Sequence, residues 1–374
     1  MAKSAIVIGA GIVGLATARA LAVRGYAVTV LERSEKAVGA SIRNFGMIWP
    51  IGQPSGTLYE RAMLSKSIWK ELCNNAKIWY EEAGSLHLAY NKTEVGVLEE
   101  FYAAEKNKRQ VALLNPKQSS RWESIVEKGL QCSLYSKDEL IVDPREAIAG
   151  IPVYLAETYR VTFHWLSAVT KVAHPTVWCG TKTYEADEIF LCTGADFEML
   201  FPEQFAAQPI TKCKLQMMRT EPQPGGWRMG PALCGGLSLI HYKSFEAAPS
   251  LPLLKEKFQQ ELPEYLTWGI HVMASQNARG EVTIGDSHEY GQSFDPFDKA
   301  SINNLILSYL KTFAKLKTFF IAETWNGIYP KLTDGRTELV LFPQSGVTVI
   351  NGMSGAGMTL SFGLCEQIVG GTFR

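Results

Sequence analysis

The sequence lacks a charge excess of either sign. Its 374 residues carry 37 Lys and Arg against 37 Asp and Glu, so the formal net charge is zero with histidine neutral. A neutral chain without a long basic run is poorly suited to bind nucleic acid or an anionic membrane. No stretch approaches the roughly 18 consecutive apolar residues that a membrane-spanning helix needs. We therefore expect no nucleic-acid partner and no membrane span.

Cysteine is scarce and shows no pattern. The 7 cysteines include no CxxC pair and no Cys/His group at metal-ligand spacing, which indicates reduced thiols and predicts no metal site. The apolar run from Ala5 to Ile8 is too short for a signal peptide and leads directly into a glycine loop. Together these features predict a cytoplasmic protein. At roughly 150 residues per domain, the length predicts two or three folding units.

The first 32 residues predict a β-α-β unit that binds a dinucleotide. A strand over residues 6–8 precedes GxGxxG at residues 9–14, and a second strand over 28–31 ends in Glu32. The glycines allow a tight turn, close approach to a pyrophosphate, and contact between helix and strand. The helix start offers N–H groups to the phosphates. The Glu32 carboxylate suits both ribose hydroxyls and would repel a 2′-phosphate, which disfavours NADP.

Two later segments favour FAD over NAD. The apolar run 189–192 ends in the turn Thr193-Gly194, which returns the chain to the cofactor. A strand over 347–350 leads into a glycine-rich turn at 352–357 and a final helix. Such a helix start can stabilise the negative charge that a flavin gains on two-electron reduction. An NAD-dependent dehydrogenase has no evident need for this third element.

The remaining pattern predicts an α/β fold with a discontinuous first domain. Asp143-Pro144 has the chemistry of a helix start. Helices are expected over 57–80 and most of 93–122, a strand over 85–89, and loops around a hairpin over 221–252. We predict a Rossmann-like FAD-binding domain of the glutathione-reductase type from residues 1–83, 143–212 and 322–374. An α+β substrate-binding domain with a mixed or antiparallel sheet would contain residues 84–142 and 213–321.

The order of these pieces resembles the FAD-dependent amine oxidoreductases of the D-amino-acid oxidase superfamily, of the glycine oxidase and sarcosine oxidase type. The matching segments span the chain: the fingerprint with Glu32-Arg33, the loop 39–41, residues 191–195, residues 325–330 and the C-terminal glycine-rich turn. No cysteine matches the covalent flavin attachment of sarcosine oxidases, which implies noncovalent FAD. The fingerprint and the resemblance together imply that the cofactor is held by Gly9, Gly11, Ile12, Val13, Gly14, Glu32, Arg33, Ala40, Ser41, Arg43, Asn44, Val169, Thr193, Gly194, Gly327, Gly352, Ser354, Gly355, Ala356, Gly357 and Met358.

The chain departs from glycine oxidases at both positions that grip a substrate carboxylate. Tyr329 stands where the family has an arginine, and Gly355 stands at a second basic position. Removing one partner of a buried charge pair costs about 2–5 kcal/mol, so a carboxylate held in the usual way is not expected. Residues 41–46 together with 286–290 further resemble a subgroup associated with aminophosphonate breakdown.

Four residues are candidates for binding the substrate. His271 and His288 stand where the family has other pocket residues, and they either donate to phosphonate oxygens or are packed histidines without a ligand. Arg43 either supplies the missing positive charge or serves the pyrophosphate or the structure. Tyr329 either donates to an anionic oxygen or fills space. Lys243, in the expected hairpin 241–243, is a weaker candidate.

These residues predict FAD-dependent oxidation of a small amine, such as an N-methylated 2-aminoethylphosphonate, to an aldehyde plus an amine. A hydride would pass to flavin N5, water would hydrolyse the imine, and O2 or another acceptor would take the electrons. No general base is assigned. The alternatives are a glycine, sarcosine or D-amino-acid oxidase that uses Arg43, a flavin monooxygenase suggested by Gly285-Asp286, and a non-enzymatic FAD module.

Overall fold

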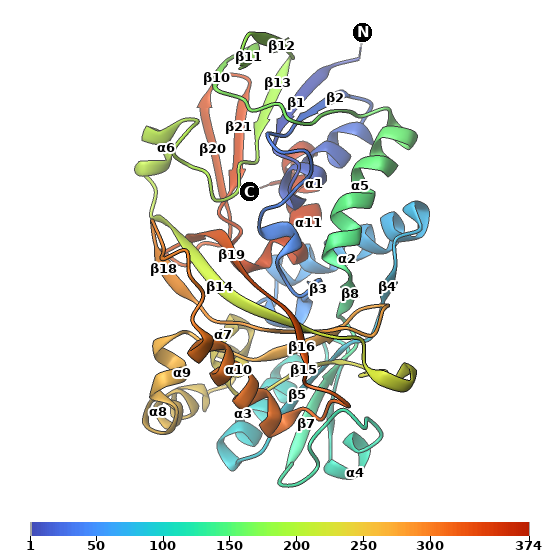
Figure 1. Ribbon diagram of the computed structural model, residues 1–374, viewed down its shortest axis with the longest axis vertical. Helices are drawn as coiled ribbons and strands as arrows, with labels where there is room; N and C mark the ends of the chain where they lie inside the picture. Colours follow the sequence, from blue (N-terminus) through green and yellow to red (C-terminus); the bar gives the residue numbers. More distant parts are fainter. Residues whose placement is uncertain (1, 374) are drawn as a thin grey trace.

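A six-stranded sheet occupies the upper part of the molecule as drawn in Figure 1. The computed structural model describes residues 2–373. All neighbouring strands in this sheet are parallel except the pair β20–β21, and the C-terminal edges of β1 and β13 lead into glycine turns. In spatial order the strands are β20 (Leu339–Gln344), β21 (Val347–Asn351), β13 (Glu188–Leu191), β1 (Ser4–Ile8), β2 (Ala27–Leu31) and β9 (Thr162–His164).

Helices cover one face of this sheet, and a small antiparallel sheet covers the other. The helices are α1 (Ile12–Ala22), α2 (Thr57–Ala76), α5 (Pro144–Tyr159) and α11 (Gly357–Val369). The opposite layer holds β10 (Lys171–Ala173), β11 (Thr176–Cys179), β12 (Lys182–Glu185) and α6 (Pro202–Ala206). Helix α1 is buried almost all round, as expected for a helix that is apolar on every side.

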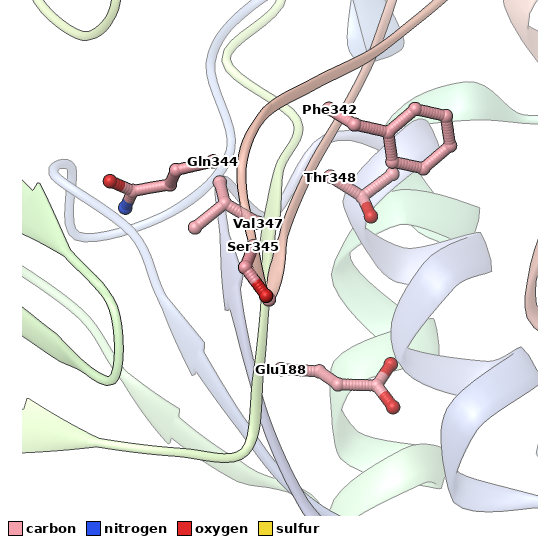
Figure 2. Close-up of a pocket in the computed structure, with 7 residues that line it drawn as sticks. Glu188, Phe342, Gln344, Ser345, Val347 and Thr348 are labelled. Atoms are coloured by element: carbon pink, nitrogen blue, oxygen red, sulfur yellow. The ribbon is translucent and has the colours of Figure 1, made fainter.

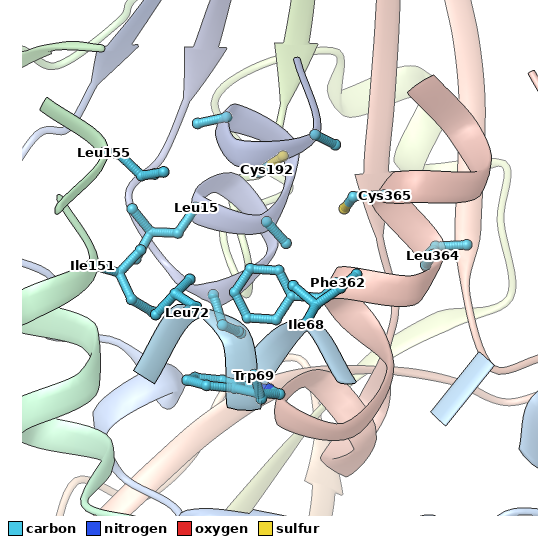
Figure 3. Packing of buried hydrophobic residues seen from close by; sticks show 14 of the residues in the cluster. Leu15, Ile68, Trp69, Leu72, Ile151, Leu155, Cys192, Phe362, Leu364 and Cys365 are labelled. Carbon is cyan, nitrogen blue, oxygen red and sulfur yellow. The ribbon is translucent and has the colours of Figure 1, made fainter. Parts of the chain in front are cut away.

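The contact between α2 and α11 fixes the start of α11. The rings of Trp69 and Phe362 meet edge to face with centroids 5.0 Å apart, in the cluster that Figure 3 shows. The indole N–H of Trp69 donates to the carbonyl of Met358 at 2.8 Å. Because both groups are buried, this hydrogen bond places the first turn of α11 with little freedom. The core thereby positions a segment that lines the candidate site.

A nine-stranded mixed sheet forms the lower part of the molecule (Figure 1). Its strands are β18 (Glu289–Gly291), β14 (Ile210–Thr220), β17 (Val282–Gly285), β16 (Met273–Gln276), β15 (Ala232–Cys234), β5 (Ser85–Ala89), β7 (Cys132–Ser136) and β6 (Val111–Leu114), with β19 (Ile321–Leu332) paired to β14. Around it lie α3 (Lys92–Glu105), α4 (Pro116–Ser119), α7 (Leu237–His241), α8 (Leu251–Glu261), α9 (Pro263–Thr267) and α10 (Ala300–Phe313). A three-stranded sheet joins β3 (Met47–Ile48), β8 (Leu140–Val142) and β4 (Tyr80–Glu81).

The predicted fold class is confirmed, and the upper sheet is built from separate stretches of chain. The predicted boundaries after residues 212 and 321 fall inside β14 and at the first residue of β19. Both strands pair with each other along almost their whole length, so they carry the chain from one sheet region to the other. The exact domain limits stay a prediction. No helix within residues 2–373 is long and apolar enough to cross a membrane.

Some local expectations were wrong. Within 93–122, α3 ends at Glu105 and only the short α4 is helical after it. Between them lies β6, an edge strand on β7, where pairing overrides local pattern. The helix expected over 57–80 ends at Ala76, because Lys77 adopts the left-handed conformation. The expected hairpin around 241–243 is absent: α7 ends at His241, and a 3-10 turn, η4, spans Lys243–Ala247. The elements β6, α7 and η4 are too short for a periodic pattern of apolar residues to reveal them.

Candidate functional site

A cavity of about 590 Å³ runs from the start of α1 to the large sheet. The four predicted substrate residues line it, namely Arg43, His271, His288 and Tyr329. The predicted cofactor residues that line it are Gly11, Ile12, Val13, Ala40, Ser41, Arg43, Asn44, Gly194, Gly327, Gly352, Ser354, Gly355, Ala356, Gly357 and Met358. Gly9, Gly14, Glu32, Arg33, Val169 and Thr193 lie outside its lining.

The glycine turn before α1 has the geometry of a phosphate cradle. Gly9 has φ of +103°, and a Cβ there would lie 2.4 Å from the carbonyl oxygen of Cys192. A Cβ on Gly14 would lie 1.9 Å from the carbonyl oxygen of Gly9. Helix α1 starts without a side-chain cap, while the N–H of Ile12 donates to Ser41 Oγ at 2.9 Å. Free N–H groups and the helix dipole at this point suit a pyrophosphate.

Glu32 lies behind this turn with its carboxylate ordered. Its two oxygens accept hydrogen bonds from the backbone N–H groups of Ala10 at 2.9 Å and Ser34 at 3.0 Å. Carboxylate oxygens have further lone pairs, so both remain able to accept ribose hydroxyls. Arg33 forms an exposed ion pair with Asp196.

The remaining two predicted cofactor residues outside the lining have local roles. The Thr193 hydroxyl donates to the carbonyl of Asp196 at 2.6 Å and so closes the turn after β13. Val169 packs against the core that contains Leu31 and Ile189. It lies two residues after Ser167, whose N–H donates to the carbonyl of Glu32. Their predicted contacts with the cofactor stay predictions.

The start of α11 meets the start of α1 at the same cavity. Helix α11 begins at Gly357 without a side-chain cap, and a Cβ on Gly357 would lie 3.5 Å from the Ile12 side chain. Two helix N-termini therefore present partial positive charge to one space. A dinucleotide-linked flavin offers a pyrophosphate for one and a ring that becomes anionic on reduction for the other, so the residues present fit FAD.

Arg43 and Asn44 shape the loop beside this space. The Arg43 guanidinium donates to the carbonyl of Asn326 on β19 at 3.1 Å, beside Gly327. The Asn44 amide donates to the carbonyls of Ala40 and Ser41, and its oxygen accepts from the N–H of Gly46. Arg43 thus ties the loop to β19, which favours its structural interpretation over that of a replacement carboxylate anchor.

Three imidazoles converge at the far end of the cavity. The rings of His271 and His288 are buried, and that of His241, at the end of α7, is open to the cavity. The ring centroid of His241 lies 3.6 Å from that of His271 and 4.9 Å from that of His288. Sequence analysis missed His241 because the residue was placed in a hairpin that does not exist.

A buried carboxyl group lies close to two of these rings. Asp286 Oδ1 lies 3.0 Å from His271 Nε2, and Asp286 Oδ2 lies 3.9 Å from His288 Nε2. Burial raises the pKa of Asp286 well above its usual range and lowers the pKa of His271 well below its own. Burial also lowers the pKa of His288 to about 4. Burial therefore favours the uncharged form of each of these groups.

The cavity holds an excess of basic groups. Its charged lining residues are Arg43, Lys243, Lys331 and Arg336 on the basic side and Asp286 on the acidic side. Lys331 lies two residues after Tyr329 on β19, so both side chains point to the same face. Lys331 lines the same cavity as both rings, and its charge contributes, after burial, to the low pKa values of His241 and His288. This strand alternation was the signal that could have identified Lys331 from sequence.

The three imidazoles also form the one group within residues 2–373 whose His, Cys or carboxylate atoms cluster closely enough for a metal ion, all lying within 4.8 Å of one another. A metal ion about 2.0–2.1 Å from an imidazole nitrogen lies in the plane of that ring. The rings of His241 and His271 are inclined by only 30° at 3.6 Å separation, so they share no such point. Holding a metal would require one ring to rotate.

A second depression lies on the upper sheet, at the turn between β20 and β21. It measures about 400 Å³ and is lined by Glu188, Phe342, Gly346 and nearby residues of the turn (Figure 2). Its one ionisable lining residue, Glu188, already accepts from Lys3 and Tyr26. This depression brings no further reactive group together.

Comparisons with known proteins agree with this geometry. The chain is 25% identical over 234 residues to the tRNA 5-methylaminomethyl-2-thiouridine biosynthesis bifunctional protein MnmC of Psychrobacter cryohalolentis, a match covering 57% of this chain but 32% of that protein. The chain therefore spans about a third of that curated relative. Glycine oxidase from Geobacillus kaustophilus superposes with a TM-score of 0.76 at 17% identity, covering 100% of this chain and 96% of that one.

A structure that contains the cofactor has the same fold. L-α-glycerophosphate oxidase from Mycoplasma pneumoniae, dithionite-reduced and with FAD bound, superposes with a TM-score of 0.73 at 17% identity, covering 98% of this chain and 94% of that one. The family model DAO, described as FAD dependent oxidoreductase, matches residues 4–369. The chain therefore belongs to the DAO family of FAD-dependent oxidoreductases, and FAD is its cofactor.

Proposed function

We propose that the protein oxidises a small amine that carries a phosphonate, such as an N-methylated 2-aminoethylphosphonate. The C–H bond beside nitrogen gives a hydride to the flavin, and water hydrolyses the resulting imine to an aldehyde and a free amine. FAD supplies the electron-accepting chemistry when bound. The observation that carries the proposal is a basic cavity lined by Tyr329 and Gly355, the residues that the sequence resemblance puts at the family's carboxylate-binding positions.

The cavity wall near the histidines is suited to hold an anion without a guanidinium fork. Tyr329 is buried, and Gly355 lies close to its hydroxyl, since a Cβ there would be 3.7 Å from Tyr329 Oη. A planar carboxylate prefers a bidentate arginine, whereas a tetrahedral anion can accept from several separate donors. Lys331 and the imidazoles supply such donors in this region.

The apolar part of the wall favours the reactive form of the amine. Phe45, Met47, Trp49, Met217 and Met273 line the cavity beside the histidines. At an ordinary amine pKa near 10.4, removing the ammonium proton at pH 7 costs about 4–5 kcal/mol. A pocket of aromatic and Met side chains lowers this cost because it disfavours the charged form. Hydride transfer from a neutral amine then needs no general base at the carbon.

An anaerobic flavin-bleaching screen of the purified holoenzyme tests the proposal. The substrates are 2-aminoethylphosphonate, its N-methyl derivative, glycine, sarcosine, D-alanine and glycerol 3-phosphate, because one relative by fold is named as a glycerophosphate oxidase. We expect the aminophosphonates to bleach the flavin fastest. Faster bleaching by an amino acid would instead support the alternative function, an amino-acid oxidase that uses Arg43. Faster bleaching by glycerol 3-phosphate would contradict amine oxidation.

A variant of the same pocket sharpens this test. Tyr329→Arg returns a guanidinium to the position where the family has one, and Tyr329→Phe is the matched control that removes only the hydroxyl. We expect Tyr329→Arg to raise the ratio of carboxylate to phosphonate turnover by at least tenfold, which corresponds to about 1.4 kcal/mol. An equal ratio in both variants would argue against Tyr329 as the specificity position.

The cofactor is proposed to be noncovalently bound. Cys192 lines the cavity, but burial raises the pKa of its thiol to about 12, so it stays protonated and a poor nucleophile. Acid precipitation should therefore release all flavin into the supernatant. Flavin retained in the precipitate would contradict this assignment. A parallel assay in air decides whether O2 or another acceptor takes the electrons.

A further inference from the structure

We propose that Lys331, His241 and His288 form an anion site that takes up one proton when a tetrahedral dianion binds. This inference rests on the proposed function for the identity of its natural ligand. It adds that the pocket itself changes protonation when it binds that ligand. For an amine substrate, the proton would be the one that its ammonium group gives up: one N–H bond of the ammonium breaks, and one imidazole N–H bond forms.

The geometry of the cluster suits a tetrahedral anion. The rings of His241, His271 and His288 lie within about 30° of one another, stacked rather than aimed at a point. The oxygens of a tetrahedral anion spread around the central atom, so donors in separate planes can each reach one.

Lys331 supplies the fixed charge. Its backbone is held on both sides, by β14 at Thr211 and by a bridge to Met353 before α11. Among residues 2–373, no carboxylate lies within 4.0 Å of its ammonium. The charge faces the cavity, where burial and then Lys243 lower its own pKa. An unpaired, half-buried ammonium gains more from an anion than an exposed one does.

The groups around the cluster make an imidazole the acceptor of the proton. Around it are Asp286 just after β17, Tyr242 and Lys243 at the start of η4, Tyr290 from β18, Tyr329 and Lys331 from β19, and Cys213 from β14. Burial raises the pKa of Asp286, which favours its protonated form over a free carboxylate that could take up the proton. Burial raises the pKa values of the tyrosines and of Cys213, so these groups stay neutral too. The neutral imidazoles remain, and a dianion beside them favours their charged form.

Sulfate is the probe for the test, because it is a tetrahedral dianion that carries no titrating proton between pH 6 and 9. The heat of sulfate binding to the purified holoenzyme is measured at pH 8 in two buffers of different ionisation enthalpy, and the difference between the two heats gives the number of protons taken up. The flavin spectrum reports the affinity. We expect uptake of about one proton and an affinity that falls up to tenfold per pH unit. Acetate should bind at least tenfold more weakly than sulfate. Sulfate binding without proton uptake, or no binding, overturns the proposal.

Two pairs of variants assign the groups. Lys331→Met should raise the sulfate dissociation constant at least tenfold, while Lys182→Met, on the exposed β12, leaves it unchanged. His241→Asn should lower the proton uptake, while His174→Asn, at the surface, does not. Equal affinity in Lys331→Met and wild type overturns the role of Lys331. If the proton uptake is unchanged in His241→Asn, the proton is assigned to His288, and His288→Asn tests this assignment. Unchanged proton uptake in both variants overturns the histidine assignment.

The outcome is separable from that of the proposed function. Proton-linked sulfate binding without bleaching by any aminophosphonate would retain the anion site and reject the substrate. Bleaching by aminophosphonates without proton-linked sulfate binding would retain the proposed substrate and reject the anion site. The two experiments use the same holoenzyme and different readouts.

Discussion

At the scale of single residues, the chain buries ionisable groups away from the cavity as well as inside it. Glu139 is fully buried, and its oxygens accept from the N–H of Ile51 at 3.0 Å and from Ser85 Oγ at 2.9 Å. Burial, only partly offset by these hydrogen bonds, and the charge of Asp138 raise the pKa of Glu139 to about 7. Ile51 adjoins residues that line the cavity, so this carboxyl supports the wall without touching the site.

The stability of the Glu139→Gln variant relative to the wild type should therefore increase as the pH rises. In the wild type, the folded-state pKa of Glu139 lies above its unfolded value. The contribution of Glu139 to the free energy of unfolding is therefore full below about pH 4.5 and is lost as the pH rises through 7. The shift from 4.5 to about 7 corresponds to about 3 kcal/mol. Unfolding midpoints in urea, measured from pH 5 to 8, should show the variant gaining on wild type by this order. The exposed Glu127→Gln is the control, and a pH-independent difference would contradict the assignment.

At the scale of elements, the turn between β1 and α1 depends on the absence of side chains. A Cβ on Gly14 would overlap the carbonyl oxygen of Gly9 at 1.9 Å, an atom of the backbone that cannot move independently. Gly96 lies inside α3, where the nearest atom to an added Cβ is Ser250 Oγ at 3.5 Å. Both are helical glycines, so they differ mainly in this contact.

Gly14→Ala should lose FAD and stability, whereas Gly96→Ala should retain both. Overpacking of this kind costs about 1–3 kcal/mol, while alanine in an open helix position gains roughly 0.5–1 kcal/mol over glycine. Flavin content by absorbance and the thermal midpoint of each purified variant measure the two effects. Full flavin content in Gly14→Ala would show that the turn adjusts and that its glycine is not required.

Elements whose signal is local could be predicted, and those made by long-range pairing could not. The β1–α1–β2 unit and the Asp143 cap follow from residues a few positions apart. By contrast β6 exists because β7 pairs with it, and α7 is too short for any periodic pattern. The histidine cluster joins His241 at the end of α7, His271 just before β16 and His288 just before β18, a convergence that exists only in the folded sheet. Sequence analysis could name His271 and His288 individually but could not place His241 beside them.

At the scale of the whole molecule, Asp143 joins the helix layer of the upper sheet to the large sheet. One oxygen caps α5 by accepting from the N–H groups of Arg145 and Glu146. The other accepts from the Asn277 amide at 2.9 Å, in the turn between β16 and β17, and lies 3.6 Å from the buried Arg219 guanidinium. Asp143 is itself buried, so a single side chain serves both a local cap and a contact between distant segments.

Asp143→Ala should therefore cost more than loss of a cap. Capping alone contributes about 0.5–2 kcal/mol, whereas removing one partner of a buried ion pair costs about 3–5 kcal/mol. Glu281, 3.4 Å from Arg219, retains part of the charge compensation, so we expect a total near 3 kcal/mol. Asp143→Asn keeps a capping oxygen and the shape, so its smaller loss isolates the charge. Urea unfolding of both variants measures the difference, and limited proteolysis shows whether the β16–β17 turn loosens. Equal losses in the two variants would mean that the charge, not the cap, dominates. Wild-type stability in both would remove Asp143 from the connection between the two sheets.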